Sequence, residues 1–450
     1  MGTVIAPTPV ETSSETQTLA LAALLGKILR REARVGVIGL GYVGLPLAVD
    51  LARVGFFVTG FDLDRERTDQ ANSGRSYIAD VDDRALRQQI DTGRFHATDD
   101  FSELSDLDTV SICVPTPLSK TKEPDLSYII QAVQAVAGHL HRGQLIILES
   151  TTYPGTTEEI VLPMLERSSL TVGEDFFLAF SPERVDPGNA TFQTCNMPKV
   201  VGGITPRCNS AASALYGLCT GRVVEVSSAR TAEMVKLLEN TFRNVNIALA
   251  NEMALLCHKF NLDVWEIIEA ARSKPFGFMP FYPGPGLGGH CIPIDPVYLT
   301  WKARANGFEP RLIEVAQQIN NHMPHHVVDR IAVALNDFGK PLRGSRVHIL
   351  GVAYKRDVAD VRESPALDIM HLLAERKAQL SYSDPFVPRL AEPGFDFTSE
   401  SLEMVREKDC VVVVTDHSGF DYPVIVRNSP VIVDTRNALA GFTDDKIYQL

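Results

Sequence analysis

The chain has 450 residues, of which 45% are hydrophobic, and its formal net charge at pH 7 is −13. This length exceeds what one hydrophobic core usually serves, so two or three domains are expected. The acidic balance argues against a nucleic-acid partner, which would need a basic face, and no apolar run approaches the length of a membrane span. No signal-peptide pattern opens the sequence, which indicates a cytoplasmic protein.

The first 30 residues are predicted to form a mobile tail and a lead-in to the first domain. Residues 1–18 are rich in Thr, Ser, Pro and Glu and offer little to bury. Seven cysteines are scattered along the chain without the CxxC spacing of a zinc site or the pattern of a disulfide framework. We therefore predict no metal site, and each cysteine taken alone is most simply a small buried hydrophobic residue.

A dinucleotide-binding domain is predicted over residues 31–220. The run RVGVIGLGYVG at residues 34–44 is typical of a β-strand that enters a GxGxxG turn, and a helix follows. Gly39 makes the tight turn, Gly41 lets a pyrophosphate approach the backbone, and Gly44 lets the helix pack on the strand. The pyrophosphate would then lie at the helix N-terminus. The residues predicted to contact the cofactor here are Gly39, Gly41, Tyr42, Val43 and Gly44.

The ends of the following strands carry polar side chains. The next strand ends in Asp62, 18 residues after Gly44. A carboxylate there accepts both hydroxyls of the adenosine ribose and repels a 2′-phosphate, which favours NAD over NADP. Two further strands end at Thr116 and Thr151, and such ends face the ligand crevice of a parallel sheet. Both threonines are candidates for the nicotinamide end, although threonine also closes strands where no ligand binds.

A central helical domain is predicted over residues 221–325. The sequence from Ser228 to Phe260 contains no Pro or Gly, which predicts one helix of some thirty residues. Lys236 and Asn240 are four residues apart and share a face of this helix, and Arg243 lies a turn further on. For Arg243 a solvated polar stripe is the alternative interpretation. The mostly apolar helix also suggests a homodimer formed through this segment.

A loop with a candidate nucleophile follows the helix. Residues 273–296 are dense in Gly, Pro and aromatic residues, and long loops of this kind are usually functional. A Gly-Gly pair that begins at Gly288 leaves the approach to Cys291 free of side chains, and Asp295 follows four residues later. This setting distinguishes Cys291 from the other cysteines. Adjacent residues of an extended chain point apart, so His290 is not assigned as a base.

Residues 326–450 are predicted to form a second α/β domain, because strand, glycine turn, helix and strand recur there. Only Gly351 of a glycine fingerprint is present, which argues against a second NAD site. Cations at the strand ends are suited to a nucleotide diphosphate, or they are ordinary surface charge. These cations are Lys355, Arg362 and Arg436. The predicted fold class is α/β, with two Rossmann-like doubly wound domains joined by a long central helix and a small helical domain.

Seven sequence blocks occur in a specific order from about residue 34 to the end of the chain. They are VIGLGYVGLPLA, CVPTP, ESTTYPGTT, FSPERVDPGN, AEMVKLLENTFRNVNIALANE, GPGLGGHCIPIDP and GVAYKRDVADVRESPA. Together they resemble the UDP-glucose/UDP-mannuronate dehydrogenase family. The wordings NSGRSYI, SPERVDPGN and FGFMPFYPGPGLGGHCIPIDP resemble its UDP-N-acetylglucosamine 6-dehydrogenase branch most closely.

The resemblance implies roles for individual residues. It implies that Cys291 is the nucleophile, that Lys236 and Asn240 are its active-site partners, and that Asp295 assists proton transfer. The remaining catalytic positions that it implies are Glu183 and Thr151. It implies adenosine-end contacts for Asp62 and Arg67. The substrate contacts that we predict are Glu183, Arg184, Lys236, Asn240, Arg243, Tyr282, Gly288, Lys355 and Arg436.

The reaction that the resemblance implies is the NAD-dependent oxidation of a sugar C6 alcohol to a carboxylate. Four electrons leave in two hydride transfers, through a thiohemiacetal and a thioester on the cysteine. UDP-glucose relatives carry a lysine where this chain has Ile294 and a glutamate where it has Pro187, so UDP-N-acetylglucosamine is the preferred substrate. The alternatives are UDP-N-acetylmannosamine, UDP-glucose and a non-catalytic sensor, which would usually have lost the nucleophile.

Overall fold

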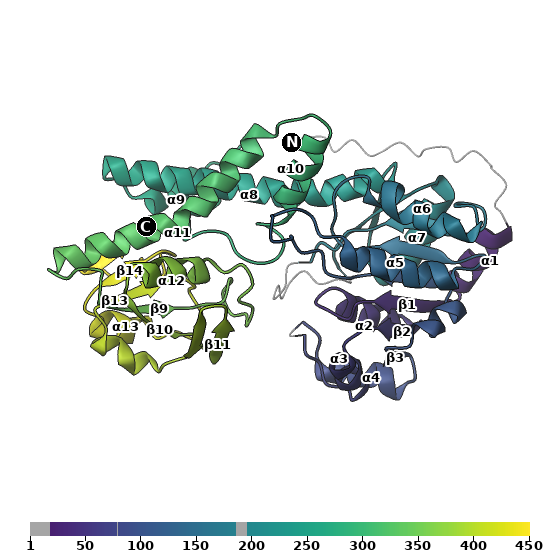
Figure 1. Cartoon of the computed structure of the whole chain (residues 1–450), viewed down its shortest axis with the longest axis horizontal. Coiled ribbons are helices and arrows are strands. Elements are labelled where there is room, and N and C mark those ends of the chain that lie inside the picture. Colours follow the sequence, from purple (N-terminus) through teal and green to yellow (C-terminus); the bar gives the residue numbers. More distant parts are fainter. Residues whose placement is uncertain (1–18, 79, 186–195) are drawn as a thin grey trace. The chain divides into compact units, whose positions relative to one another are not determined.

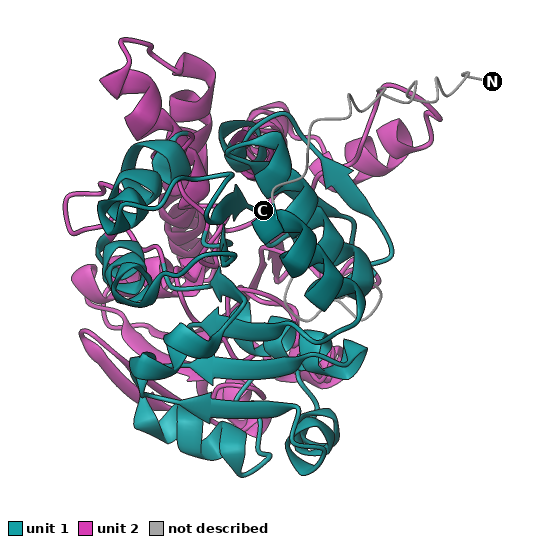
Figure 2. Cartoon of the chain, turned by 90° about the vertical axis from the view of Figure 1, so that its right-hand side faces the viewer, with its two compact units in different colours: residues 1–115, 127–150, 155–233 teal, residues 116–126, 151–154, 234–450 magenta. Residues whose placement is uncertain are grey.

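The computed structural model describes residues 19–78, 80–185 and 196–450. Figure 2 shows that they divide into two compact units, each described here by itself. The first unit comprises the chain up to Pro115, Ser127–Ser150 and Gly155–Glu233. The second comprises Thr116–Leu126, Thr151–Pro154 and Met234–Leu450. The predicted tail, residues 1–18, lies outside the described residues, as do Pro187 and Cys195.

Eight strands in the described part of the first unit form one sheet, in the order β3-β2-β1-β4-β5-β6-β7-β8. The strands are β1 (Arg34–Ile38), β2 (Phe57–Phe61), β3 (Phe95–Thr98), β4 (Thr109–Ile112), β5 (Leu145–Leu148), β6 (Phe177–Phe180), β7 (Lys199–Gly203) and β8 (Val223–Glu225). All neighbours from β3 to β6 are parallel, and β7 runs antiparallel to β6. The order reverses between β1 and β4, and ligands of open parallel sheets bind at such a switch point.

Helices cover this sheet. They are α1 (Leu19–Leu29), α2 (Gly44–Val54), α3 (Arg65–Asn72), α4 (Asp83–Asp91), α5 (Ser127–His139), α6 (Leu162–Leu165) and α7 (Pro206–Cys219). Residues 1–30 were predicted as a mobile tail and a lead-in, without an assigned helix. Helix α1 packs against α7 and buries Leu21, Leu24 and Ile28, whose spacing places them on one face. Its residues therefore belong to the core of the first unit.

The long helix α8 (Ala229–Phe260) has 32 residues and confirms the predicted central helix. From Met234 onwards it belongs to the second unit. Helices α9 (Val264–Arg272), α10 (Asp295–Ala305) and α11 (Arg311–Asp337) follow it. Figure 1 shows α11, in green, beside the C-terminal sheet, where it contacts β13 (Cys410–Val413) and β14 (Ile432–Asp434). Among the described residues, no helix combines the length and the apolar character that crossing a membrane requires.

The C-terminal part of the second unit is a parallel sheet in the order β10-β9-β13-β14-β15. Its strands are β9 (Arg346–Leu350), β10 (Gln379–Ser383), β13 (Cys410–Val413), β14 (Ile432–Asp434) and β15 (Ile447–Gln449), and its helices are α12 (Pro365–Glu375) and α13 (Tyr422–Asn428). An antiparallel hairpin of β11 (Arg389–Glu392) and β12 (Phe395–Thr398) was not predicted. The predicted class, two Rossmann-like α/β sheets and a long central helix, is confirmed.

Candidate active site

The glycine turn of the first unit matches the geometry that a diphosphate requires. A Cβ on Gly39, whose φ is +89°, would lie 2.7 Å from the carbonyl oxygen of Cys113. A Cβ on Gly44 would lie 1.8 Å from the carbonyl oxygen of Gly39, so both positions require glycine. Gly41 faces open space, with no atom within 4 Å of its Cβ position. Val43 directly precedes α2 and no side chain caps this helix start, and the N-terminus of a helix favours a phosphate.

Asp62 lies at the end of β2, as predicted. Its carboxylate accepts hydrogen bonds from the backbone N–H of Leu40, at 2.9 Å, and of Asp64, at 3.0 Å. The Arg67 guanidinium is 3.6 Å from Asp62 and lies over the ring of Tyr77. The Tyr77 hydroxyl donates to the carbonyl of Leu40 at 2.8 Å and so ties this edge to the glycine turn. Sequence reasoning missed Tyr77, although it belongs to the NSGRSYI block.

Glu183 follows β6 in the first unit. One carboxylate oxygen accepts from the backbone N–H groups of Arg184 and Val185, both at 2.8 Å. The other accepts from Lys199 Nζ at 3.1 Å, and Lys199 also donates to Glu149 at 2.5 Å. Burial opposes ionisation, but the Lys199 charge and these hydrogen bonds hold the pKa of Glu183 below its usual value. Sequence reasoning missed both Lys199 and Glu149.

Thr116 and Thr151 belong to the second unit, although the strands they follow belong to the first. Thr116 forms a side-chain hydrogen bond with the Tyr298 hydroxyl, which also donates to the carbonyl of Pro117 at 3.1 Å. The ring of Tyr153 lies 5.0 Å from that of Trp301, centroid to centroid. Tyr298 and Trp301 are residues of α10, so this helix holds both strand-end segments. Both predicted threonines therefore share a unit with Cys291.

The residues predicted around the nucleophile come together at the start of α10. Asp295 is the first residue of this helix and is 3% exposed. Its carboxylate accepts a hydrogen bond of 2.5 Å from the side-chain amide of Asn240, and its backbone N–H donates to the carbonyl of Cys291 at 2.8 Å. Lys236, one turn before Asn240 on α8, is also buried. The shared helix face predicted for Lys236 and Asn240 is directed at the cysteine loop.

The charges of this cluster set the protonation of the thiol and the carboxylate. Burial, with the Asp295 charge, raises the pKa of the Cys291 thiol to about 11, and Lys236 opposes the shift. Burial raises the pKa of Asp295 to about 6, again opposed by Lys236 and by the Asn240 hydrogen bond. Arg243, which is exposed on α8, and Arg362 also lower the pKa of Cys291. Asp295 is therefore tuned close to neutral pH, where a general base is most effective.

The second domain of this unit shapes the cysteine loop. A Cβ on Gly288 would lie 2.7 Å from the Tyr354 Cβ, and a Cβ on Gly289 would lie 2.8 Å from the Tyr354 ring. The backbone N–H of Gly289 donates to the carbonyl of Arg362 at 3.0 Å. Within the described chain, Nδ1 of His290 is buried without a hydrogen-bond partner, and burial lowers the pKa of this ring to about 4. This environment gives His290 no features of a base.

Three buried asparagines fasten both ends of the cysteine loop, and none of them was predicted. Asn251 accepts from the backbone N–H of Gly284 at 2.9 Å and donates to Asn320 of α11 at 2.9 Å. Asn320 donates to the backbone carbonyl of Asn244 at 3.1 Å. Asn244 in turn donates to the carbonyl of Ile292 at 3.3 Å. A continuous chain of amides thus links α8 and α11 to the loop on either side of the thiol.

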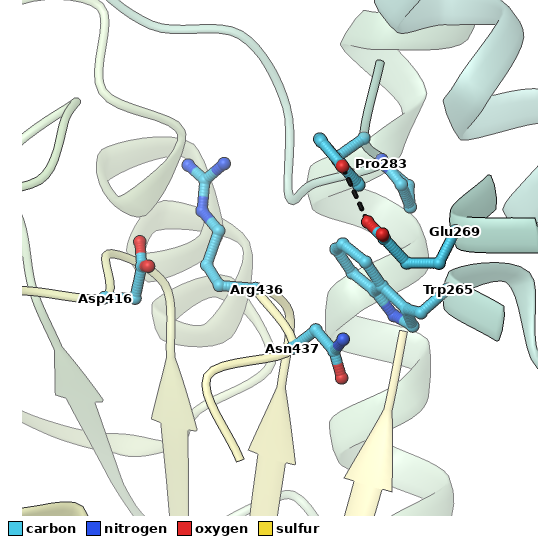
Figure 3. Close-up of a pocket in the computed structure, with 7 residues that line it drawn as sticks. Trp265, Glu269, Pro283, Asp416, Arg436 and Asn437 are labelled. Carbon is cyan, nitrogen blue, oxygen red and sulfur yellow. Dashed lines mark hydrogen bonds between the residues drawn. The ribbon is translucent and has the colours of Figure 1, made fainter. Parts of the chain in front are cut away.

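The second unit has a cavity of about 320 Å³, and Figure 3 shows Arg436 among the residues that line it. The residues that line it are Trp265, Glu269, Tyr282, Pro283, Asp416, Arg436 and Asn437. The Tyr282 ring stacks on Trp265, and its hydroxyl donates to Glu269 at 2.7 Å. Arg436 donates through Nε to the carbonyl of Val414 at 2.8 Å. Lys355, on the loop after β9, is not among the lining residues.

Among the described residues, no group of three or more His, Cys, Asp or Glu side chains is arranged to hold a metal ion. The described cysteines are free thiols, and Cys291 is the one that is not fully buried among them.

Comparisons with known proteins cover nearly the whole chain. Models of the UDP-glucose/GDP-mannose dehydrogenase family match residues 33–219 as its NAD binding domain, 230–322 as its central domain and 348–441 as its UDP binding domain. The UDP-N-acetyl-D-mannosamine dehydrogenase of Pyrococcus horikoshii is 37% identical over 414 residues, which are 90% of this chain and 96% of that protein. The UDP-N-acetyl-D-glucosamine 6-dehydrogenase of Pseudomonas aeruginosa is 36% identical over 393 residues, which are 87% and 92%.

Solved structures agree with these matches. The structure of the Pyrococcus horikoshii UDP-N-acetyl-mannosamine dehydrogenase superposes with a TM-score of 0.84 at 35% identity, over 92% of this chain and 98% of that one. The structure of a UDP-glucose dehydrogenase from Pyrobaculum islandicum superposes with a TM-score of 0.82 at 27% identity, over 92% and 97%. The chain therefore belongs to the UDP-glucose/GDP-mannose dehydrogenase family and is an NAD-dependent dehydrogenase.

Proposed function

We propose that this enzyme oxidises the C6 hydroxymethyl group of UDP-N-acetylglucosamine to the carboxylate, with two NAD consumed per sugar. The observation that carries the proposal is the cluster of Cys291, Lys236, Asn240 and Asp295, which joins a thiol, a cation, an amide donor and a near-neutral carboxylate. NAD, when bound at the glycine turn and Asp62, accepts a hydride from C6 in each oxidation. Thr116 and Arg67 are its further proposed contacts.

Cys291 prevents the loss of the aldehyde between the two oxidations. Its sulfur bonds to C6 of the aldehyde and gives a thiohemiacetal, with the thiol proton passing to the aldehyde oxygen. Removal of a hydride from C6 and of the hydroxyl proton then gives a thioester. Water releases the acid and regenerates the thiol. Four electrons have left the sugar, and the cysteine is unchanged.

Lys236 and Asn240 are proposed to stabilise the negative charge that develops on the C6 oxygen. Both are buried, so their donors act in a region of low dielectric. Asp295 is proposed to accept protons from the C6 hydroxyl and from the thiohemiacetal hydroxyl. Its pKa of about 6 leaves it ionised at neutral pH yet basic enough for that role.

Hydrolysis of the thioester requires an oriented water molecule. We propose that Thr151 and Glu183 orient it, as the family resemblance implies. Glu183 follows β6 in the first unit. The ionised state of Glu183 suits a group that binds water through its lone pairs.

The nucleotide is proposed to bind at the cavity of Trp265, Tyr282 and Arg436. The stacked aromatic pair offers an apolar face to the uracil, and the guanidinium offers donors to the phosphates. The remaining substrate contacts are proposed as in the sequence analysis: Arg184, Arg243, Gly288 and Lys355. Together these contacts place the sugar at Cys291.

The choice of sugar rests on sequence blocks rather than on contacts. Ile294 stands where UDP-glucose relatives carry a lysine, and the two sequence relatives that are 37% and 36% identical act, by their names, on N-acetylated sugars. A panel of UDP-sugars tests this choice, with NADH measured by absorbance and the product identified by mass. We expect UDP-N-acetylglucosamine to give two NADH per sugar. Faster oxidation of UDP-N-acetylmannosamine or UDP-glucose would reassign the substrate, and binding without NADH would favour the sensor alternative.

A homodimer through α8 is proposed as the assembly. This helix exposes an apolar stripe at a spacing of four and seven residues, formed by Leu238, Phe242, Leu249 and Leu256. Exposed apolar stripes on a helix mark association surfaces. A second copy of the same stripe is its proposed partner, because isologous dimers are the commonest assembly. Light scattering on the purified enzyme, with Leu249→Glu as the disrupting variant, tests the mass.

A further inference from the structure

Glu183 belongs to a buried group of charged and polar side chains in the first unit. It consists of Lys199, Glu149, Glu183 and Tyr216, and we refer to it as the Lys199 cluster. Glu149 directly follows β5, Glu183 follows β6 and Lys199 begins β7, so three neighbouring strands bring these side chains together. The exposed fractions of the Lys199 and Glu149 side chains are 4% and 0%, whereas that of Glu183 is 14%.

The contacts of the Lys199 cluster fix the position of the Lys199 ammonium group. Lys199 Nζ lies 2.5 Å from Glu149 Oε2 and 3.1 Å from Glu183 Oε2, and it lies over the Tyr216 ring. The Tyr216 hydroxyl donates to the other oxygen of Glu149. Glu149 therefore accepts a hydrogen bond from Lys199 on one carboxylate oxygen and from the Tyr216 hydroxyl on the other. On Glu183, Lys199 holds Oε2 while two backbone N–H groups hold Oε1.

Stability alone does not account for this arrangement. Well-packed apolar residues often replace a buried ion pair without loss of stability, because desolvation of the charges is costly. Here one ammonium serves two carboxylates, which adds a buried negative charge beyond a simple pair. The second carboxylate is the more exposed one, and it is the one that the proposed function places beside the substrate.

We propose that Lys199 is a positioning residue for Glu183, and that Glu149 and Tyr216 hold Lys199 in place. The cluster keeps the Glu183 carboxylate ionised and in one orientation for hydrolysis of the thioester. This inference rests on the proposed function, because it assigns Lys199 to the hydrolytic half of that reaction. It predicts that the two oxidations do not depend on Lys199.

The surrounding charges support the same division of roles. Burial opposes the charge on Lys199, but its two carboxylate partners raise the pKa of its ammonium, so it stays protonated. Burial raises the pKa of Glu149, whereas the pKa of Glu183 is lowered, so acidification protonates Glu149 first. The other titratable groups that interact with the cluster are Asp50 and its partner Arg53 on α2, and Cys113 after β4. Burial raises the pKa of both Asp50 and Cys113 and keeps the thiol neutral.

Removal of the cation has a consequence with a definite sign. Without Lys199 the pKa of Glu183 rises, so the carboxylate takes up a proton as the pH falls through this higher value. Hydrolysis would then slow at low pH and recover at high pH, where Glu183 is ionised again. Damage to the fold would lower both half-reactions at every pH, so recovery at high pH identifies positioning.

The experiment compares four proteins by rapid quench at about pH 6 and about pH 8.5. They are the wild type, Glu183→Gln, the double variant Lys199→Met with Glu149→Gln, and Lys408→Met. The double variant removes the ammonium together with the Glu149 carboxylate, so Glu149 is not left as an unpaired buried charge. Lys408→Met breaks a partly buried ion pair of 2.6 Å with Glu400 in the second unit and is the matched control. Each protein receives UDP-N-acetylglucosamine and NAD, and the intact mass after acid quench reports the sugar adduct on Cys291.

We expect the double variant to accumulate the thioester adduct at the lower pH, with hydrolysis slowed about 10-fold, and to resemble the wild type at the higher pH. Glu183→Gln should accumulate it at both values, with hydrolysis slowed about 100-fold. Lys408→Met should behave as the wild type. If the double variant fails to fold, the single variant Lys199→Gln should show the same pH-dependent adduct.

Two results separate the inference from the function on which it rests. If Glu183→Gln accumulates the adduct but the Lys199 variants hydrolyse it at the wild-type rate at both pH values, Lys199 does not position Glu183. If neither the wild type nor Glu183→Gln ever carries an adduct on Cys291, the covalent route of the proposed function is wrong.

Discussion

The two units each bury a lysine beside a carboxylate, and they tune that carboxylate in opposite directions. In the first unit Lys199 donates directly to Glu183, whose pKa is lowered. In the second unit the direct donor to Asp295 is the neutral amide of Asn240, and the pKa rises to about 6. The comparison teaches that burial alone does not decide the protonation state of a carboxylate. Glu183 stays ionised because the Lys199 charge acts together with two backbone N–H donors, whereas Asp295 has one neutral amide donor and remains able to accept a proton.

The largest expected effect comes from removing the Cys291 thiol, which lies beside Lys236, Asn240 and Asp295 in the second unit. Cys291→Ser should lower the rate of acid formation on the order of 1000-fold, because serine is not activated as a nucleophile there. Substrate binding and the first oxidation should persist. Mass analysis of the product and calorimetric binding of the UDP-sugar measure the two parts. Acid formation at the wild-type rate would contradict the covalent route.

A smaller loss of activity is expected from removing Lys236, the cation beside Cys291 and Asp295. Lys236→Met should lower kcat about 100-fold, because one donor to the developing oxyanion is lost. Lys236 also lowers the pKa of Asp295, so its removal should move the acidic limb of the pH–rate profile to higher pH. Lys259→Met, at an exposed position near the C-terminal end of the same helix, α8, is the control. An unchanged acidic limb would show that Asp295 does not govern it.

Asp295 itself allows a test of the comparison by stability. Its pKa in the folded protein, about 6, exceeds the ordinary value of 3.8, so folding favours its protonated form. The stability tied to that proton is present at low pH and is lost as the pH rises through about 6. At neutral pH, the free energy of unfolding of Asp295→Asn should therefore exceed that of the wild type by about 2–3 kcal/mol, while the variant loses activity. Denaturant titration measures this difference. Equal stability near neutral pH would mean that Asp295 is ionised as easily as in water.

The smallest effect concerns a carboxylate that is held by backbone N–H groups rather than by a lysine. Asp62→Ser should shift the preference between NAD and NADP about 10-fold towards NADP, because the repulsion of a 2′-phosphate is removed. The ratio of kcat/KM for the two cofactors measures this shift. Asp64→Ser is the control, because Asp64 is the N-cap of α3 and serine is also a favourable N-cap residue. Equal use of both cofactors by the wild type would remove Asp62 from the selection.

Local patterns were enough to predict much of the fold. The absence of Pro and Gly over α8 predicted its 32 residues, and the glycine turn predicted the first strand and helix. The setting of Cys291 also came from local sequence, because glycine and proline density is a local signal. Helix α1 was missed, because its pattern of Leu21, Leu24 and Ile28 acquires meaning only against α7.

Clusters assembled by the sheet were beyond sequence reasoning. Lys199 and Glu149 are 50 residues apart in the sequence. They meet because β5 and β7, which carry them to the same edge, both lie next to β6 in the sheet. No spacing along the chain encodes that contact. Trp265 and Glu269 were missed for a related reason, since the ring and carboxylate face Tyr282 of the following loop. The asparagine chain from Asn244 to Asn320 likewise joins two helices that are distant in sequence.

The division of the chain into units has a consequence for protein engineering. The backbone passes from one unit to the other at five points, after Pro115, Leu126, Ser150, Pro154 and Glu233. No single cut therefore yields two independent halves. A chimaera that exchanged the cofactor-binding half for that of a relative by one junction in α8 would import the strand-end segments of the donor. Such grafts must keep residues 116–126 and 151–154 with the recipient, because Thr116 and Tyr153 of these segments contact Tyr298 and Trp301 of α10.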